Sequence, residues 1–146
     1  MRTLGRLALG AALAGAGVSH LTTAREEFQA QVPAWVPLDE DVVVLASGVV
    51  EIGLGAALLA APRRWRPAVG LAAAGFFVAI FPGNIAQYTE GVDAFGLDTD
   101  TKRFVRLFFQ PVLIALALWS TEALSSGVGA ALVSRGRERL GLSGDR

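Results

Sequence analysis

A glutamate within an apolar stretch is the first residue in this sequence that suggests chemistry. Glu51 lies in the run from Val42 to Ala61, and Ser47, Gly48 and Gly55 fall three or four residues away on the same helical face. An ionisable side chain at the centre of a membrane helix costs about 2.5 to 3.5 kcal/mol on insertion scales. Glu51 must therefore face the protein interior, where an ionisable residue is by default a candidate functional group.

Five further polar residues fall towards the same half of the bilayer when the apolar runs are taken as helices. They are His20 in the first run, Asn84 and Gln87 in the third, and Arg106 and Gln110 in the fourth. Pro82 has no amide hydrogen and therefore frees the carbonyl of Val78, which adds another polar group at this depth. We predict that these five residues and Glu51 line one pocket that opens to the outer side.

The residue types suggest a role for most members of this pocket. Glu51 and His20 would handle protons or hydrogen-bond the carbonyl groups of a ligand. Arg106 would set the charge state of Glu51, because a nearby cation favours an ionised carboxylate. Asn84 and Gln110 would orient the ligand through their amides.

A purely structural role for the same residues stays open. Glu51 and Arg106 would then pair, and the amides of Asn84 and Gln110 would fill their remaining hydrogen-bond positions. A membrane bundle needs such contacts to hold its helices in register. His20, at the end of a helix, would be a solvated interface residue.

Composition narrows the chemistry further. The chain has no cysteine, which excludes disulfides, thiolate zinc sites and iron–sulfur clusters. Its single histidine leaves too few ligands for a metal site, and we expect neither metal nor haem. A net charge of zero argues against nucleic acid as a partner. No nucleophile–base pair or cofactor motif is present in the sequence, so the question of enzymatic activity stays open. Aromatic residues such as Phe81 and Tyr88 are more typical of helix packing than of stacking on a quinone ring.

Four apolar runs carry the polar residues. The chain of 146 residues is 53% apolar and 18% charged, which favours a membrane over water as its solvent. Each run is close to the roughly 20 residues that a spanning helix needs. We expect an all-α, polytopic four-helix transmembrane domain over residues 1–124, located in the cell membrane and specifically in a bacterial inner membrane, and a cytoplasmic tail over residues 125–146. The expected spans cover about residues 3–21, 42–61, 67–88 and 104–124.

The first run has an alternative interpretation as a signal peptide. Arg2 and Arg6 precede it, and the small residues from Ala14 to Gly17 resemble a cleavage region. The run continues through Val18 without a polar segment, which favours a spanning helix.

Basic residues divide unequally between the two sides of the expected bundle. Nine lie on the side of the N-terminus, the turn at residues 63–66 and the tail, whereas four lie on the other side. This distribution predicts that both termini are cytoplasmic. The outer connections are acidic, and the one at residues 22–41 contains two prolines around Trp35, which suits a segment at the membrane surface. Arg103, at the start of the fourth run, is expected to extend its side chain to the interface.

Small residues recur at four-residue spacing within the spans. We expect these positions to pack the helices of the bundle closely together, rather than to form a dedicated dimer motif. The positions are Ala8, Ala12 and Ala16, Ala11 and Gly15, and Gly70 and Ala74.

Four short motifs, one in each span, resemble in order and spacing those of the DoxX-like family of small four-helix membrane proteins. They are Gly17-Val18-Ser19-His20, Val50-Glu51-Ile52-Gly53, Phe81-Pro82-Gly83-Asn84 and Arg106-Leu107-Phe108-Phe109-Gln110. Gly83 stands where the family commonly has alanine, and Phe109 where it often has proline or leucine. The resemblance covers residues 2–124. It implies a relationship to the small subunit of a thiosulfate:quinone oxidoreductase and to proteins that assist the assembly of other membrane proteins.

Two functions are compatible with these features. In the first, the chain is a membrane subunit that binds a small redox-active or lipidic molecule, such as a quinone, in the outer pocket and serves an oxidoreductase system. Its partners would be the lipid bilayer, a membrane or redox protein, and possible further copies of the chain in a homo-oligomer. The alternative is a non-catalytic accessory or assembly protein, in which the proline-rich outer loop contacts a partner and the polar cluster stabilises the fold. Transport has little support, because four spans show no internal repeat.

Overall fold

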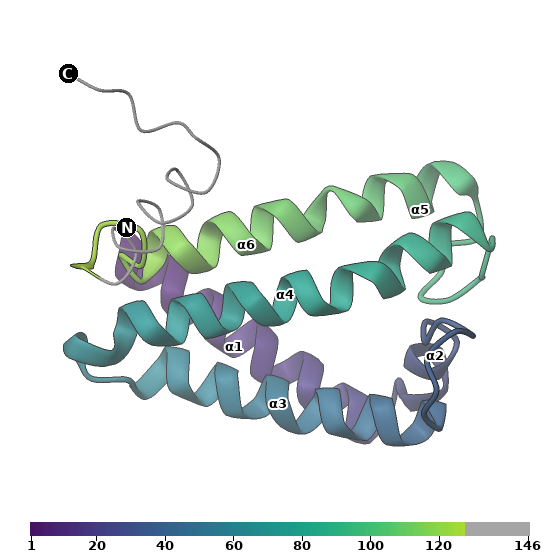
Figure 1. The fold of residues 1–146 in the computed structure, drawn as a ribbon, viewed down its shortest axis with the longest axis horizontal. Helices are drawn as coiled ribbons and strands as arrows, with labels where there is room; N and C mark the ends of the chain where they lie inside the picture. Colours follow the sequence, from purple (N-terminus) through teal and green to yellow (C-terminus); the bar gives the residue numbers. More distant parts are fainter. Residues whose placement is uncertain (128–146) are drawn as a thin grey trace.

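The computed structural model describes residues 1–127, and this part of the chain is helical, with turns and no strand (Figure 1). The elements are α1 (Arg2–Leu21), α2 (Arg25–Gln29), α3 (Glu40–Ala60), the 3-10 turn η1 (Arg63–Trp65), α4 (Arg66–Thr89), α5 (Asp100–Leu107) and α6 (Phe109–Ser120). The all-α prediction is confirmed for these residues. The predicted tail lies outside the described residues from position 128 onward.

Four helical stretches are long and apolar enough to cross a membrane, as the apolar runs predict. They are Arg2–Leu21, Glu40–Ala60, Arg63–Thr89 and Asp100–Ser120. The second and fourth stretches begin before their apolar runs because polar side chains cap them. Asp39 accepts hydrogen bonds from the backbone of α3, and Thr99 accepts one from the backbone of α5. The fourth stretch ends at Ser120, four residues before the end of the predicted span, because Glu122 adopts a left-handed conformation with φ of 60°.

The fourth stretch is interrupted at Phe108, where the sequence predicts one continuous helix. Pro111 has no amide hydrogen for the carbonyl of Leu107. Next to it, the Phe108 amide bonds to the Val105 carbonyl at 3.1 Å, which is one residue closer than in an α-helix. Helices α5 and α6 still follow one another in nearly the same direction (Figure 1).

The bundle has two different ends (Figure 1). One end holds the N-terminus, the connection from α3 through η1 to α4, and the end of α6. We call it the arginine-rich end, after Arg2, Arg6, Arg63, Arg64 and Arg66. The other end holds α2 and the connection from α4 to α5, and we call it the loop end.

Helix α1 packs along α3 through glycines. A Cβ added to Gly17 would lie 2.6 Å from the carbonyl oxygen of Gly48, and one added to Gly55 would lie 2.6 Å from the backbone nitrogen of Ala14. No side chain fits at these positions, so the two backbones are in direct contact. The apolar core beside this contact consists of Leu9, Leu13, Leu58, Ala73, Ala74, Phe77 and Ala117.

The small-residue spacing predicts these contacts only in part. Gly70 and Ala74 are buried, as expected. On the first helix the prediction is wrong, since all the small residues that it names there are exposed except the half-buried Ala16: Ala8, Ala11, Ala12 and Gly15. Helix α1 instead buries the face that carries Leu9 and Leu13, because larger apolar side chains gain more from burial than alanine does.

Candidate functional site

The polar residues of the loop end surround a cavity of about 330 Å³. Five of the six residues predicted to line a pocket do line it, namely His20, Glu51, Asn84, Arg106 and Gln110. The remaining wall is mostly apolar and comes from α1, α2, α3, α4, α6 and the connection between α2 and α3. An apolar cavity of this size with a few converging polar groups is typical of a small-molecule site.

Glu51 on α3 and His20 on α1 are buried against each other. Oε2 of Glu51 lies 3.0 Å from Nδ1 of His20, and the two side chains are only 6% and 8% exposed. The same Nδ1 lies 2.8 Å from the carbonyl oxygen of Ala16. Because both neighbours of Nδ1 are oxygen atoms, we assign the ring hydrogen to this nitrogen, which donates it to the Ala16 carbonyl.

Two buried polar atoms at the cavity have no hydrogen-bond partner among the described residues. One is Nδ2 of Asn84, a donor. The other is Oε2 of Glu51, an acceptor, which lies close to Nδ1 of His20 but receives no hydrogen bond from it, because the hydrogen of that nitrogen is directed to the Ala16 carbonyl. Glu51 is 4% exposed and Asn84 is 6% exposed, so bulk water does not supply the hydrogen bonds that these two atoms lack. An unpaired buried atom of this kind costs about 1 to 3 kcal/mol. The wall of the cavity therefore offers one acceptor and one donor to a ligand.

Gln110 is held in place by the bundle itself. Its Nε2 donates to the carbonyl oxygen of Phe77 at 2.9 Å, and the residue is 1% exposed. Phe77 directly precedes Val78, whose carbonyl Pro82 cannot satisfy. Gln110 therefore bonds to the carbonyl of the residue before Val78, and not to the carbonyl that Pro82 frees.

Arg106 lines the cavity as a half-buried cation. Within residues 1–127 it forms no ion pair, and the predicted pair with Glu51 is not formed because Glu51 faces His20 instead. A guanidinium group without a counterion, next to an apolar cavity, favours a ligand that carries an oxygen acceptor.

Gln87 lies outside the cavity, which corrects the prediction that it lines the pocket. It is 2% exposed, and its Oε1 accepts a hydrogen bond of 2.7 Å from Nε2 of Gln31. Its Nε2 faces the carbonyl oxygens of Val92 and Ala94 at 3.4 and 3.5 Å. Three residues along a helix turn a side chain about 60° away from its starting direction. Gln87 therefore points to the loops while Asn84 points to the cavity.

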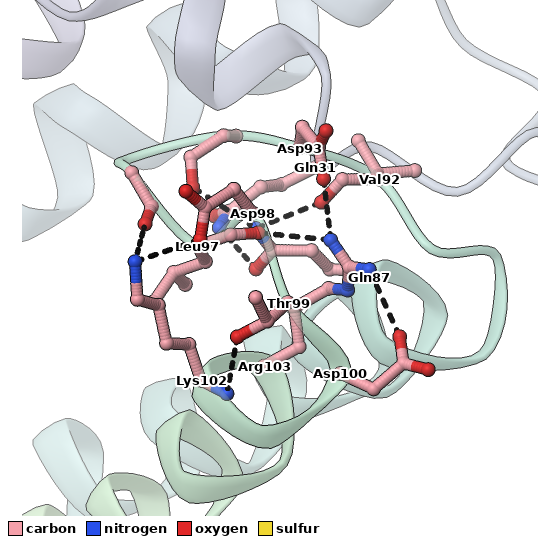
Figure 2. A network of polar contacts seen from close by, with 12 residues as sticks. Gln31, Gln87, Val92, Asp93, Leu97, Asp98, Thr99, Asp100, Lys102 and Arg103 are labelled. Carbon is pink, nitrogen blue, oxygen red and sulfur yellow. Dashed lines mark hydrogen bonds and ion pairs between the residues drawn. The ribbon is translucent and has the colours of Figure 1, made fainter.

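Arg103 is buried, although the sequence suggests a side chain that extends to a membrane interface. It is 7% exposed and donates to the carboxylate of Asp93, to the carbonyl of Leu97 at 2.9 Å and to the carboxylate of Asp100 at 2.9 Å. Figure 2 shows these contacts gathered next to Gln87. The cluster holds the connection between α4 and α5 against both helices.

The connection between α2 and α3 covers the cavity, whereas the sequence suggests a segment along the membrane surface. Gln31, Val32, Pro33, Trp35 and Val36 contribute to the cavity wall. Gly83 on α4 permits the close approach, since a Cβ there would lie 3.2 Å from the carbonyl oxygen of Gln31. The apolar residues around Pro33 within an acidic connection are the only sequence signal for this cover.

Phe28 on α2 is a lining residue that the sequence does not single out. Its ring stacks on the His20 ring with 3.4 Å between centroids and 17° between planes. It also meets the ring of Phe95 at 4.6 Å. Phe95 has a φ of 56°, which is unusual for an aromatic residue, and its amide donates to the carboxylate of Glu27. These contacts join α2 to the connection between α4 and α5.

The described residues thus define an all-α protein with four helices of membrane-spanning length and a cavity with polar groups at one end. A family model matches residues 9–121, from α1 to the turn after α6. The chain therefore belongs to this family, which is described as a domain of unknown function (DUF8561). No curated protein and no solved structure matches the chain.

Proposed function

We propose that the protein is a DoxX-like, multi-pass membrane protein that binds a small redox-active or lipidic molecule, such as a quinone, in the loop-end cavity. The observation that carries this proposal is that two buried atoms, Oε2 of Glu51 and Nδ2 of Asn84, form no hydrogen bond within residues 1–127. Polar clusters that only stabilise a fold pair their members with one another. A ligand with a carbonyl and a hydroxyl group would satisfy both atoms.

The distribution of helices and charges supports a location in the cell membrane. Four helices have the required length and apolarity. The five arginines of the arginine-rich end lie opposite the loop end, which would place that end and both termini in the cytoplasm. Under this proposal the cavity lies in the outer half of the bilayer.

The resemblance to the DoxX-like family gains support from the convergence of its motifs. His20, Glu51 and Asn84 come from three different helices, and Arg106 and Gln110 come from the α5–α6 stretch. All five side chains line the same cavity. Residues that served only to pack each helix would have no reason to meet at one cavity.

The chemistry of the wall favours a ligand with an apolar body and an oxygen-bearing ring. Arg106 and Nδ2 of Asn84 would donate to a carbonyl oxygen, and Oε2 of Glu51 would accept from a hydroxyl group. Quinones and quinols carry these groups on an apolar skeleton. We therefore propose an oxidoreductase-associated role, in which the ligand passes between this protein and a redox partner in the membrane.

Tryptophan fluorescence provides a direct test. Trp35 lines the cavity, whereas Trp65 in η1 and Trp119 in α6 lie towards the arginine-rich end. A variant with Trp65→Phe and Trp119→Phe leaves Trp35 as the single reporter. Titration with a short-chain benzoquinone, which quenches indole fluorescence, should give saturable quenching.

Substitutions in this reporter background locate the binding. Glu51→Gln and Arg106→Gln should each weaken binding about tenfold, the loss of one hydrogen bond with a charged group. Ser47→Ala is the matched control, because Ser47 lies one turn from Glu51, donates to the Val44 carbonyl, and is not one of the described residues that form the cavity wall. Unchanged affinity in both Glu51→Gln and Arg106→Gln would rule out the proposal.

The alternative, an accessory or assembly protein, is favoured by the apolar surface of the loop end. Trp35, Leu38 and Val42 are exposed by 68%, 61% and 54% of their surface. On this reading the cavity substitutions lower thermal stability in detergent, and no quinone quenches Trp35. Stability and quenching measured on the same variants therefore separate the two functions.

A further inference from the structure

A second, smaller cavity lies at the arginine-rich end of the bundle. Its volume is about 90 Å³, and residues of α1, η1, α4, the end of α6 and the turn after α6 line it. The lining includes four arginines and a single carboxylate among the described residues, so positive charge is in excess. These residues are Arg2, Arg6, Arg63 and Arg66, with Glu122.

Two of the arginines already have structural partners. Arg6 is 5% exposed and donates to the carbonyl oxygens of Leu58 and Leu59, which lie in the last turn of α3 and have no helical partner. Arg2 pairs with Glu122 at 2.9 Å on the rim. The uncompensated charge of the cavity therefore rests on Arg6, Arg63 and Arg66. Of these, Arg63 and Arg66 keep guanidinium donors for a ligand.

The remaining donors point to an oxygen-rich anion. Arg63 has no hydrogen-bond or ion-pair partner within residues 1–127, and Arg66 donates only through Nε, to the carbonyl of Ala61 at 3.3 Å. Ser120 supplies an independent observation. It is 5% exposed, it lines the cavity, and its Oγ has no hydrogen-bond partner in the described part of the chain.

We propose that this cavity binds a phosphate group, either that of an anionic phospholipid headgroup or free inorganic phosphate. Arginine binds phosphate oxygens through paired hydrogen bonds, and the Ser120 hydroxyl supplies a further donor. The cavity has about a quarter of the volume of the loop-end cavity, which favours a compact anion over a larger ligand body. Basic pockets between membrane helices commonly bind lipid headgroups.

The two adjacent arginines of η1 allow a sharp test. Arg63 lines the cavity, whereas Arg64 is equally charged, also exposed, and absent from the cavity wall. The full-length protein, purified in detergent, is titrated with phosphatidylglycerol by native mass spectrometry and with inorganic phosphate by calorimetry. Arg63→Gln should weaken binding about tenfold, as expected for one charge-assisted contact, whereas Arg64→Gln should change it by less than about twofold.

Ser120→Ala provides a second variant that keeps every charge. It should weaken binding about threefold to tenfold and leave thermal stability unchanged or higher, because Oγ has no partner to lose. Binding of phosphatidylglycerol alone with this dependence identifies a lipid site. Binding of inorganic phosphate with the same dependence identifies a site for free phosphate. Equal losses in Arg63→Gln and Arg64→Gln, or no saturable binding of either probe, would overturn the proposal.

Discussion

Helix α3 meets its surroundings in two different ways. At Gly48 and Gly55 its backbone touches that of α1, and even a single added carbon would collide. Between these glycines, Glu51 contacts His20 and opens onto a cavity of about 330 Å³. One face of one helix thus contains both close backbone contacts with α1 and a polar group without a full set of hydrogen bonds.

This difference indicates which part of the molecule serves stability. The glycine contacts contain no unpaired polar side chain, so every atom there contributes to packing. The cavity keeps Glu51 and Asn84 in a state that costs free energy in the absence of a ligand. A bundle selected for stability alone would have filled this space with apolar side chains. The closely packed contact between α1 and α3 supports the cavity, and the cavity is the place for binding.

The largest effect is expected where the two backbones touch. Gly55→Ala should destabilise the protein by about 1 to 3 kcal/mol, because the added Cβ meets the backbone of α1 at 2.6 Å. Gly53→Ala is the control, since open space surrounds Gly53 and alanine favours a helix by up to about 1 kcal/mol. Unfolding in detergent should move in opposite directions for the two variants. If both gain stability, the α1–α3 contact is looser than described.

The two arginines of α5 should differ in their effect on stability. Arg103→Gln removes contacts with Asp93, Asp100 and the Leu97 carbonyl, and the melting temperature should fall by several degrees. Arg106→Gln removes no ion pair within residues 1–127 and should leave the melting temperature nearly unchanged. A larger fall for Arg106→Gln would show that Arg106 stabilises the fold rather than a bound ligand.

The two buried amide side chains of α4, Asn84 at the cavity and Gln87 at the loops, should differ in their effect on stability. Asn84→Leu removes an amide whose Nδ2 forms no hydrogen bond within residues 1–127 and replaces it with an apolar side chain of similar shape, which should raise stability without ligand by up to about 1 kcal/mol. Gln87→Leu removes the bond to Gln31 at 2.7 Å and should lower stability by about 1 kcal/mol. Thermal unfolding of both variants in detergent measures the difference. Loss of stability in Asn84→Leu would mean that the cavity amide has a structural partner.

The smallest expected effect is on the pH dependence of folding stability. The hydrogen bond from Lys102 holds the pKa of Asp98 below its ordinary value of 3.8. The folded state therefore favours the ionised carboxylate, and this contribution is present above pH 3.8 and is lost as the pH falls through the lowered pKa. Asp98→Asn should be slightly less stable than the wild type at neutral pH. The difference should disappear in strong acid and shrink in high salt, since the pair is exposed.

Much of the site could be predicted from residue types and positions along the chain. The depth of Glu51 and Gln110 in their helices follows from counting residues at a rise of 1.5 Å each, so it was predictable that both would line the same cavity. The direction of Gln87 was not, because a helix has no fixed rotation about its axis until its neighbours pack against it. The same rotation decided that Glu51 faces His20 and that Arg106 does not pair with it.

The sequence by itself determined four apolar helices and the end of the bundle at which the costly polar residues gather. Hydropathy and helical spacing are local properties, and a chain this apolar has few alternatives to helices. Only the tertiary structure decided that the connection around Pro33 covers the cavity and that Arg103 is buried among carboxylates. These contacts join segments far apart in the chain, and the energy of each depends on a partner that local sequence does not specify. The same is true of the opposite end, where arginines that sequence analysis assigns to orientation surround a cavity with an unpaired serine.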